Sequence, residues 1–253
     1  MPNILFQLFS IITCLVFLVP PTFAEDTKVM RFVTAARADS SLFKLSRLTL
    51  TEAFKRLGYD FELNSYPQKR SIHLMKLGKV DGDATRVYNF NRDNEHPYYA
   101  RTDESHVKIY FSVYMVNPTV KINTWNDLKK GGYRIGYLGG VKHIEQNLIG
   151  LIDPAKLFIQ PTSNLNGRRQ LAHGRIDAYV YANSARATKD LAAVDLKNSG
   201  VALAGVVDSK GMFPYFQVKH KAMATDLAKK IREIKAEGLF EIYQNQVLSP
   251  SSS

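Results

Sequence analysis

The feature that most constrains the fold is an alternation of short apolar strands with helices in the first third of the chain. The pattern runs strand 29–33, helix 43–57, strand 59–63, helix 69–77 and strand 80–85. Gly58 and Gly78 follow the two helices, at the C′ position where glycine commonly ends a helix. A β-α-β-α-β order predicts a parallel sheet with right-handed crossovers, and hence an α/β protein.

The pattern changes at residues 107–115, where apolar and polar side chains alternate strictly, as in one long amphipathic strand. No helix precedes this strand, so we expect the chain to cross there into a second lobe. The expected second lobe is helix 125–130, strand 133–137, helix 141–148, strand 157–160, helix 166–173, strand 176–181 and helix 186–194. Strands 202–207 and 215–218 then bring the chain back to a final helix, which ends at Gly238.

The first 24 residues contain no charged side chain and have an apolar run over residues 4–19. Pro20-Pro21 and Thr22-Phe23-Ala24 follow, which is typical of a signal peptide with a small-residue cleavage site. We expect cleavage after Ala24 and a periplasmic mature protein. The alternative is an uncleaved membrane anchor, because the apolar run approaches the length that spans a bilayer.

Composition excludes several classes of site. The only cysteine is Cys14, inside the predicted leader, so we expect no disulfide and no thiolate metal site in the mature chain. No two of the six histidines are four residues apart, and no metal or cofactor is expected. The net charge of +11 comes from Lys and Arg spread along the chain, which does not indicate nucleic-acid binding. The charge reflects either a basic surface or attraction of an anionic ligand.

Polar and cationic residues follow the second and third strands, at one edge of the predicted sheet. They are Tyr66, Arg70, Thr85, Arg86, Tyr88 and, in the following loop, Arg92. Ligands of open α/β sheets bind outside the carboxyl ends of the strands, so this edge is the predicted binding site. Arg86 and Arg70 are candidates for bidentate binding of a carboxylate. The alternatives are that these arginines are surface residues that pair with Asp81 or Asp83, and that the tyrosines belong to the lobe core.

In the second lobe, Gly139 and Gly140 stand between a strand and a helix, where their backbone N–H groups could bind an anion. The alternative is an ordinary tight turn. No GxSxG motif and no recognisable pair of catalytic carboxylates occur, so no catalytic residue is expected.

Three stretches together carry a family resemblance: RSIHLMKLGKVDGDATR, TWNDLKKGGYRIGYLGG and RRQLAHGRIDAYVYAN. Over about residues 28–245 the chain resembles the family 3 extracellular solute-binding proteins, type II periplasmic binding proteins best known for polar amino acids. The resemblance implies two α/β lobes joined by two crossover strands, with hinge closure on a ligand between them. It implies lobe 1 from residues 25–111 and 208–248, lobe 2 from 112–207, and a polar tail over 249–253.

Two positions differ from what the resemblance implies for amino-acid binders. Their α-carboxylate is held by an arginine in the loop after the third strand, which Arg92 matches by count. Their α-ammonium is held by an aspartate five residues after the GRxDA aspartate, where this chain has Ala182 followed by Asn183. A buried ammonium without that partner would cost several kcal/mol. We therefore expect a small polar or anionic ligand, and we add Asn183 to the candidate site.

The resulting expectation is a monomeric periplasmic protein that captures a small molecule for an inner-membrane permease of the ABC type. One alternative is a binding protein that senses its ligand for a membrane signalling receptor. Another is a dehydratase or lyase on the same scaffold, using Asp83 or His143.

Overall fold

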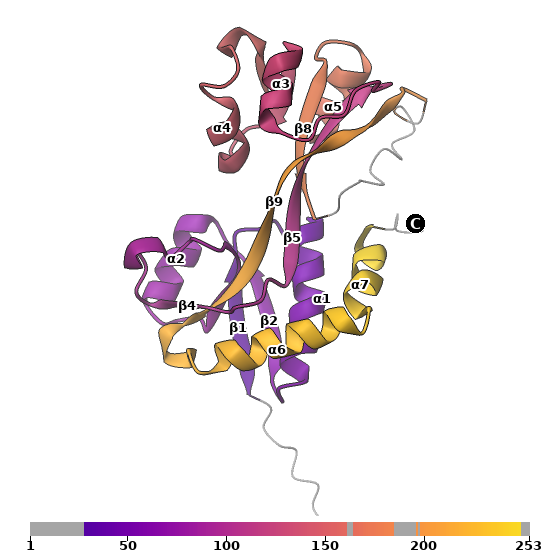
Figure 1. The fold of residues 1–253 in the computed structure, drawn as a ribbon. Helices are drawn as coiled ribbons and strands as arrows, with labels where there is room; N and C mark the ends of the chain where they lie inside the picture. The colour runs from indigo at the N-terminus through magenta and orange to yellow at the C-terminus, as the bar shows by residue number, and fades with distance from the viewer. Residues whose placement is uncertain (1–27, 161–163, 185–195, 197, 249–253) are drawn as a thin grey trace, which may run out of the picture.

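The computed structural model describes residues 28–160, 164–184, 196 and 198–248. Two α/β halves stand end to end and are joined by two long strands, β5 (Val107–Val116) and β9 (Val201–Gln217) (Figure 1). We call the half nearest the N-terminus lobe 1 and the other half lobe 2. The predicted leader, the predicted helix 186–194 and the polar tail lie outside the described residues. No helix in the described ranges is long and apolar enough to cross a bilayer.

Lobe 1 contains four short strands and four α-helices besides its share of β5 and β9. Its elements are β1 (Val29–Thr34), α1 (Ser41–Lys55), β2 (Asp60–Ser65), α2 (Gln68–Lys76), β3 (Gly82–Val87), the 3-10 turn η1 (Arg92–Asn94), β4 (Tyr99–Arg101), the 3-10 turn η5 (Val218–His220), α6 (Met223–Ala236) and α7 (Leu239–Leu248). The short strand β4 and the helix α7 were not predicted from the sequence.

Lobe 2 has three short strands and three α-helices among the described residues. They are α3 (Trp125–Gly131), β6 (Ile135–Leu138), α4 (Lys142–Leu148), β7 (Leu157–Gln160), α5 (Asn164–Ala172) and β8 (Ala178–Asn183), with the 3-10 turn η2 (Pro154–Lys156) before β7. Each of these three strands and three α-helices was predicted within a few residues of its observed bounds.

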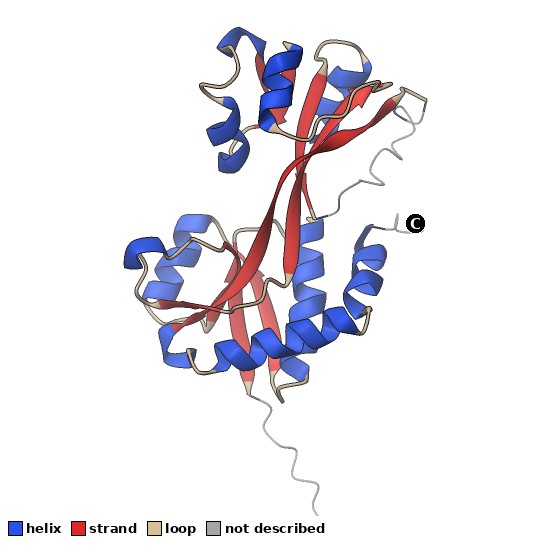
Figure 2. Cartoon of the chain, viewed as in Figure 1, coloured by secondary structure: helices blue, strands red, loops and turns tan. Residues whose placement is uncertain are grey.

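A single sheet runs through both lobes in the order β2-β1-β3-β9-β5-β8-β6-β7, with β4 added beside β9 (Figure 2). β1, β2 and β3 pair in parallel, and so do β6, β7 and β8. The antiparallel pair of β5 and β9 separates these two parallel sets. The predicted α/β class with two lobes is confirmed.

The strand directions make the carboxyl ends of the two parallel sets face each other. As β3 advances, its partner on β9 moves from Phe216 to Met212, toward lobe 2. As β8 advances, its partner on β5 moves from Tyr114 to Tyr110, toward lobe 1. In each lobe, the edge at which open α/β sheets bind ligands therefore faces the other lobe.

The prediction of two separate return strands, 202–207 and 215–218, is wrong. The chain instead forms the 17-residue strand β9. β9 is central in the sheet, and its ladder with β5 continues through Gly211. Pro214, which has no N–H to donate, lies where the register of β3 shifts between Asp83 and Arg86.

The predicted lobe boundaries at 111/112 and 207/208 remain a proposal. The ladder supports them: Phe111 pairs with Asp208 but Ser112 pairs with Val206, so Val207 is an extra residue in β9. A β-bulge of this kind bends a strand and increases its twist.

Each lobe has its own hydrophobic core. In lobe 1, Phe32, Phe54 and Phe216 are fully buried between the sheet and helices α1 and α6, with ring centroids 5.3 to 6.1 Å apart. In lobe 2, Ile135 and Val180 belong to a second cluster, which packs against α3 and α4. These cores hold the strands rigidly, and thereby fix the loops that follow their carboxyl ends.

Candidate functional site

A pocket of about 410 Å³ lies at the end of lobe 1 that faces lobe 2. Its lining residues are Tyr88, Asn89, Asn91, Arg92, Arg101 and Tyr215. They come from the loop after β3, from the end of β4 and from β9, so three segments that are distant in sequence build one site. We call it the rim pocket. It contains Tyr88 and Arg92 of the predicted site residues.

Arg101 is the most firmly placed cation of the rim pocket. Its guanidinium carbon lies 3.4 Å from the centroid of the Tyr88 ring and 5.4 Å from that of Phe213. Its Nη1 donates to the carbonyl of Tyr88 at 3.2 Å, and its Nη2 lies 3.5 Å from Asp103, whose side chain is 79% exposed. Stacking on aromatic rings fixes a planar guanidinium without neutralising its charge.

The second cation, Arg92, is exposed and lies in a loop held by Asn91. The Asn91 amide donates to the carbonyl of Tyr99 at 3.1 Å and accepts from the backbone N–H of His96 at 2.9 Å. Within the described ranges the Arg92 side chain makes no ion pair. The hydrogen bonds of Asn91 tie the loop to β4 and to His96, whereas the charge of Arg92 has no ion-pair partner among the described residues.

Arg86 does not line the rim pocket. It is 5% exposed, and its guanidinium forms a pair with the fully buried Asp83: Nε donates at 2.7 Å and Nη2 lies 2.6 Å away. The guanidinium also lies 4.5 Å from the ring centroid of Phe90. Burial raises the pKa of Asp83, while Arg86 favours its ionised form. The alternative given above is thus right about the partner, Asp83, but the pair is buried and does not lie at the surface.

The other predicted lobe 1 residues lie around the same end of the sheet. Arg70 is exposed at the start of α2, with its guanidinium 4.5 Å from the half-buried Tyr66 ring. The hydroxyls of Thr85 and Thr34 share a short hydrogen bond that links β3 to β1. None of these three predicted residues is among the lining residues of the rim pocket.

In lobe 2 the predicted backbone donors are already bonded. The N–H of Gly139 donates to the carbonyl of Gln160 at 3.0 Å, and that of Gly140 donates to the carboxylate of Glu145 at 2.8 Å. Gly140 has φ +84°, a conformation that favours glycine. Asn183 is buried, and its Oδ1 accepts from Ser41 and from the N–H of Ser184. These contacts favour the alternative that Gly139 and Gly140 form an ordinary tight turn. They also show that Asn183 makes a contact between the two lobes.

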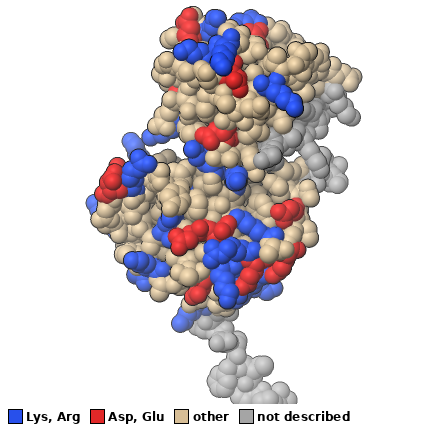
Figure 3. Space-filling model, viewed as in Figure 1, with Lys and Arg blue, Asp and Glu red and all other residues tan. Residues whose placement is uncertain are grey.

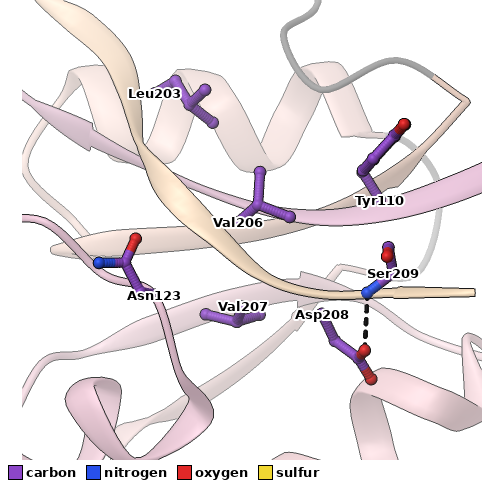
Figure 4. Close-up of a pocket in the computed structure, with 7 residues that line it drawn as sticks. All are labelled: Tyr110, Asn123, Leu203, Val206, Val207, Asp208 and Ser209. Atoms are coloured by element: carbon purple, nitrogen blue, oxygen red, sulfur yellow. Dashed lines mark hydrogen bonds between the residues drawn. The ribbon is translucent and has the colours of Figure 1, made fainter.

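A second pocket, of about 540 Å³, lies beside β9 at the junction of the lobes (Figure 4). Asp208 on its wall accepts from His143 of α4 at 2.6 Å and from its neighbour's N–H, that of Ser209, at 2.6 Å. Burial opposes ionisation of Asp208, but these bonds and Lys210 outweigh it and lower the pKa of Asp208.

The residues considered for a lyase are therefore both engaged in the fold, Asp83 with Arg86 and His143 with Asp208. The described residues include no group of three or more His, Cys, Asp or Glu arranged to hold a metal ion.

Sequence reasoning missed Arg101. β4 has only three residues, too few to show a strand period, and it pairs with a distant part of β9, with Arg101 opposite Tyr215. Only the tertiary structure brings Arg101 beside Tyr88.

The space-filling view shows the molecule narrowing where the two halves meet (Figure 3).

No protein-family model matches the chain. An uncharacterized protein of Shewanella oneidensis is 27% identical over 206 residues, which cover 81% of this chain and 76% of that protein. Several solved structures share the fold over most of the chain, at lower sequence identity. The L-cystine solute receptor of Neisseria gonorrhoeae, in its unliganded open conformation, has a TM-score of 0.62 at 15% identity, covering 88% of this chain and 93% of that one.

Two further solved structures agree. An ancestral arginine-binding protein bound to arginine has a TM-score of 0.57 at 17% identity, over 87% of this chain and 98% of that chain. The substrate-binding protein of an amino-acid ABC transporter has a TM-score of 0.52 at 17% identity, over 86% and 98%. The fold is that of the two-lobed periplasmic solute-binding proteins. At these identities the likeness shows the fold and leaves the ligand undetermined.

Proposed function

We propose that this chain is a divergent family 3 solute-binding protein, which captures a small polar or anionic molecule between its two lobes. The observation that carries the proposal is the placement of the rim pocket. Its two arginines lie at the carboxyl ends of the lobe 1 strands, and those ends face the corresponding ends in lobe 2. Two strands join the lobes, which is the architecture of hinge closure around a ligand. The solved structures of similar fold include arginine-, cystine- and amino-acid-binding proteins, which supports the same role.

We further propose that the mature protein is a periplasmic monomer that delivers its solute to an inner-membrane permease of the ABC type. The apolar leader over residues 1–24 and its small-residue cleavage site support export. Copurification from membranes tests the partner: a permease would support the transport role, and a signalling receptor in its place would contradict it.

Binding is tested by a thermal-shift screen of small acids, amino acids, amines and sugars. A ligand at 100 times its Kd should add about 2.7 kcal/mol to the free energy of unfolding. The shift should be lost in Arg101→Ala and retained in Arg31→Gln, a change of the same charge at a residue that pairs with Glu62 outside the rim pocket.

Hinge closure is tested with the same ligand by small-angle scattering. The radius of gyration should fall when the ligand is added, because a ligand favours the closed state only through contacts to both lobes. A ligand that stabilises the protein without compaction would contradict hinge closure, and the absence of any stabilising ligand would contradict the binding role.

A further inference from the structure

The rim pocket has an unbalanced charge. Among its lining residues are two arginines and no carboxylate. Asp83, on the neighbouring strand β3, is fully buried and already paired with Arg86. Asp103 lies 3.5 Å from Arg101, but its side chain is 79% exposed, where solvent screens the attraction. Most of the positive charge of this pocket therefore remains for a ligand.

The binding geometry of Arg101 is incomplete without an acceptor. Its Nε is buried and has no hydrogen-bond partner among the described residues. A buried N–H without a partner costs about 1–3 kcal/mol, so an acceptor that reaches it is favoured. The Tyr88 and Phe213 rings hold the plane of the guanidinium, and a planar carboxylate matches the N–H groups of a fixed guanidinium.

At the carboxyl end of β6, one oxygen of the Glu145 carboxylate accepts from the N–H of Gly140, which holds this acid in the glycine turn. The carboxyl end of β8, in contrast, has no carboxylate among its described residues. At the carboxyl end of β8 the residues are Ala182 and Asn183, and Asn183 is bonded to Ser41. An ammonium group enclosed there would lose its hydration without gaining an ion pair.

We infer that the ligand is a small dicarboxylate without a cationic group, with one carboxylate bound by Arg101 and the other by Arg92. The inference rests on the proposed function, and it specifies the ligand of the same site. Two carboxylates match two separate guanidinium groups, and the absence of an ammonium matches the absence of a carboxylate among the described residues at the carboxyl end of β8. A pocket of about 410 Å³ accommodates a short carbon chain between the two charges.

The test is calorimetric titration of the full mature chain at low ionic strength with malonate, succinate, glutarate and adipate. For the dicarboxylate that binds best, two matched comparisons follow: the amino dicarboxylate of the same length (L-aspartate for succinate, L-glutamate for glutarate) and the monocarboxylate of the same length. We expect the plain dicarboxylate to bind at least tenfold more tightly than either. Arg101→Gln and Arg92→Gln should each weaken it at least tenfold, whereas Arg31→Gln should not.

The possible failures are distinguishable. Tighter binding of an amino acid, a monocarboxylate or a neutral solute would overturn the dicarboxylate inference and leave the binding role standing. Equal affinity of the two glutamine variants and the parent chain would overturn the assignment of the two arginines. The unfolding midpoints of the variants without ligand, compared with that of Arg31→Gln, show whether a loss of affinity comes from a loss of folding. If no small molecule bound and no compaction occurred, both the inference and the proposed function would fail.

Discussion

The two lobes share one aspartate contact but use the residues after it differently. In lobe 1, Asp81 accepts from the backbone N–H of Arg31 at 3.0 Å, and in lobe 2, Asp177 accepts from that of Arg134 at 2.8 Å. Two residues later, lobe 1 has the buried Asp83 and lobe 2 has the buried Tyr179. The shared contact belongs to the framework of each lobe, and the difference places a buried carboxylate in lobe 1 where lobe 2 has an uncharged tyrosine.

On the proposed function, we predict from this comparison that lobe 1 recognises the ligand and that lobe 2 covers it. In lobe 1 the pair of Asp83 and Arg86 occupies the interior, so that the charges of Arg92 and Arg101 remain at the surface of the rim pocket. In lobe 2 the Glu145 carboxylate accepts from the N–H of Gly140 in the glycine turn. Variants of matched residues in the two lobes can test this division.

The largest effect is expected from Asp83→Ala. It leaves the buried guanidinium of Arg86 without its counter-charge, which should lower the free energy of unfolding by about 3–5 kcal/mol. Urea denaturation measures this change. The double variant Asp83→Leu/Arg86→Met should recover much of the loss, because apolar side chains can replace a buried ion pair. A double variant no more stable than Asp83→Ala would show that the unpaired charge of Arg86 does not cause the loss of stability.

The next effect concerns pH and His106, which is fully buried in lobe 1 with Nε2 2.8 Å from the Ser46 hydroxyl. Burial lowers the pKa of His106 to about 3, whereas an unfolded histidine has a pKa of about 6.5. Between these values the unfolded chain binds a proton that the folded chain does not. The free energy of unfolding should therefore fall as the pH falls below 6.5, by up to about 1.4 kcal/mol per pH unit.

Urea denaturation between pH 7 and pH 4.5 measures the slope of the free energy of unfolding against pH. His106→Gln should flatten it, whereas His143→Gln, at the partly exposed histidine of lobe 2, should leave the His106 contribution in place. Asp81 and Asp177 have lowered pKa values, so their contributions are present above about pH 4 and are lost only at lower pH. An unchanged slope in His106→Gln would contradict the assignment.

A smaller effect is expected from Gly140→Ala in the lobe 2 turn. Alanine at φ +84° should cost about 1–2 kcal/mol of stability, and Gly150→Ala, at φ +81°, should cost the same. Because the N–H of Gly140 is already bonded to Glu145, neither change should alter the Kd of a ligand found in the screen. A selective loss of affinity in Gly140→Ala would place lobe 2 among the ligand-binding walls and break the comparison.

The smallest effect is expected from replacing the ion pair of Arg134 and Asp177 in lobe 2. Both side chains are more than a third exposed, so solvent screens their attraction. Asp177→Asn should leave the urea midpoint almost unchanged, in contrast to Asp83→Ala. A loss comparable to that of Asp83→Ala would show that exposure does not distinguish the ion pairs of the two lobes.

The sequence by itself determined the parallel βαβ units of both lobes, the crossing at β5 and the edge at which polar residues gather. Local patterns were sufficient because strand alternation, helix periodicity and glycines such as Gly58 and Gly78 act over a few residues. It also predicted Tyr88 and Arg92, which the structure places in the lining of the rim pocket; Tyr88 directly follows β3, and Arg92 lies in the loop after it.

Only the tertiary structure decided which arginines line the rim pocket. Arg86 and Arg101 are equally cationic, but Asp83 neutralises the first inside the core, and β9 brings the second beside Tyr88. The continuity of β9 and the occupied N–H groups of Gly139 and Gly140 were likewise set by partners far away in sequence or by side-chain geometry. The charge available at a site depends on its neighbours in space, and residue order alone does not specify those neighbours.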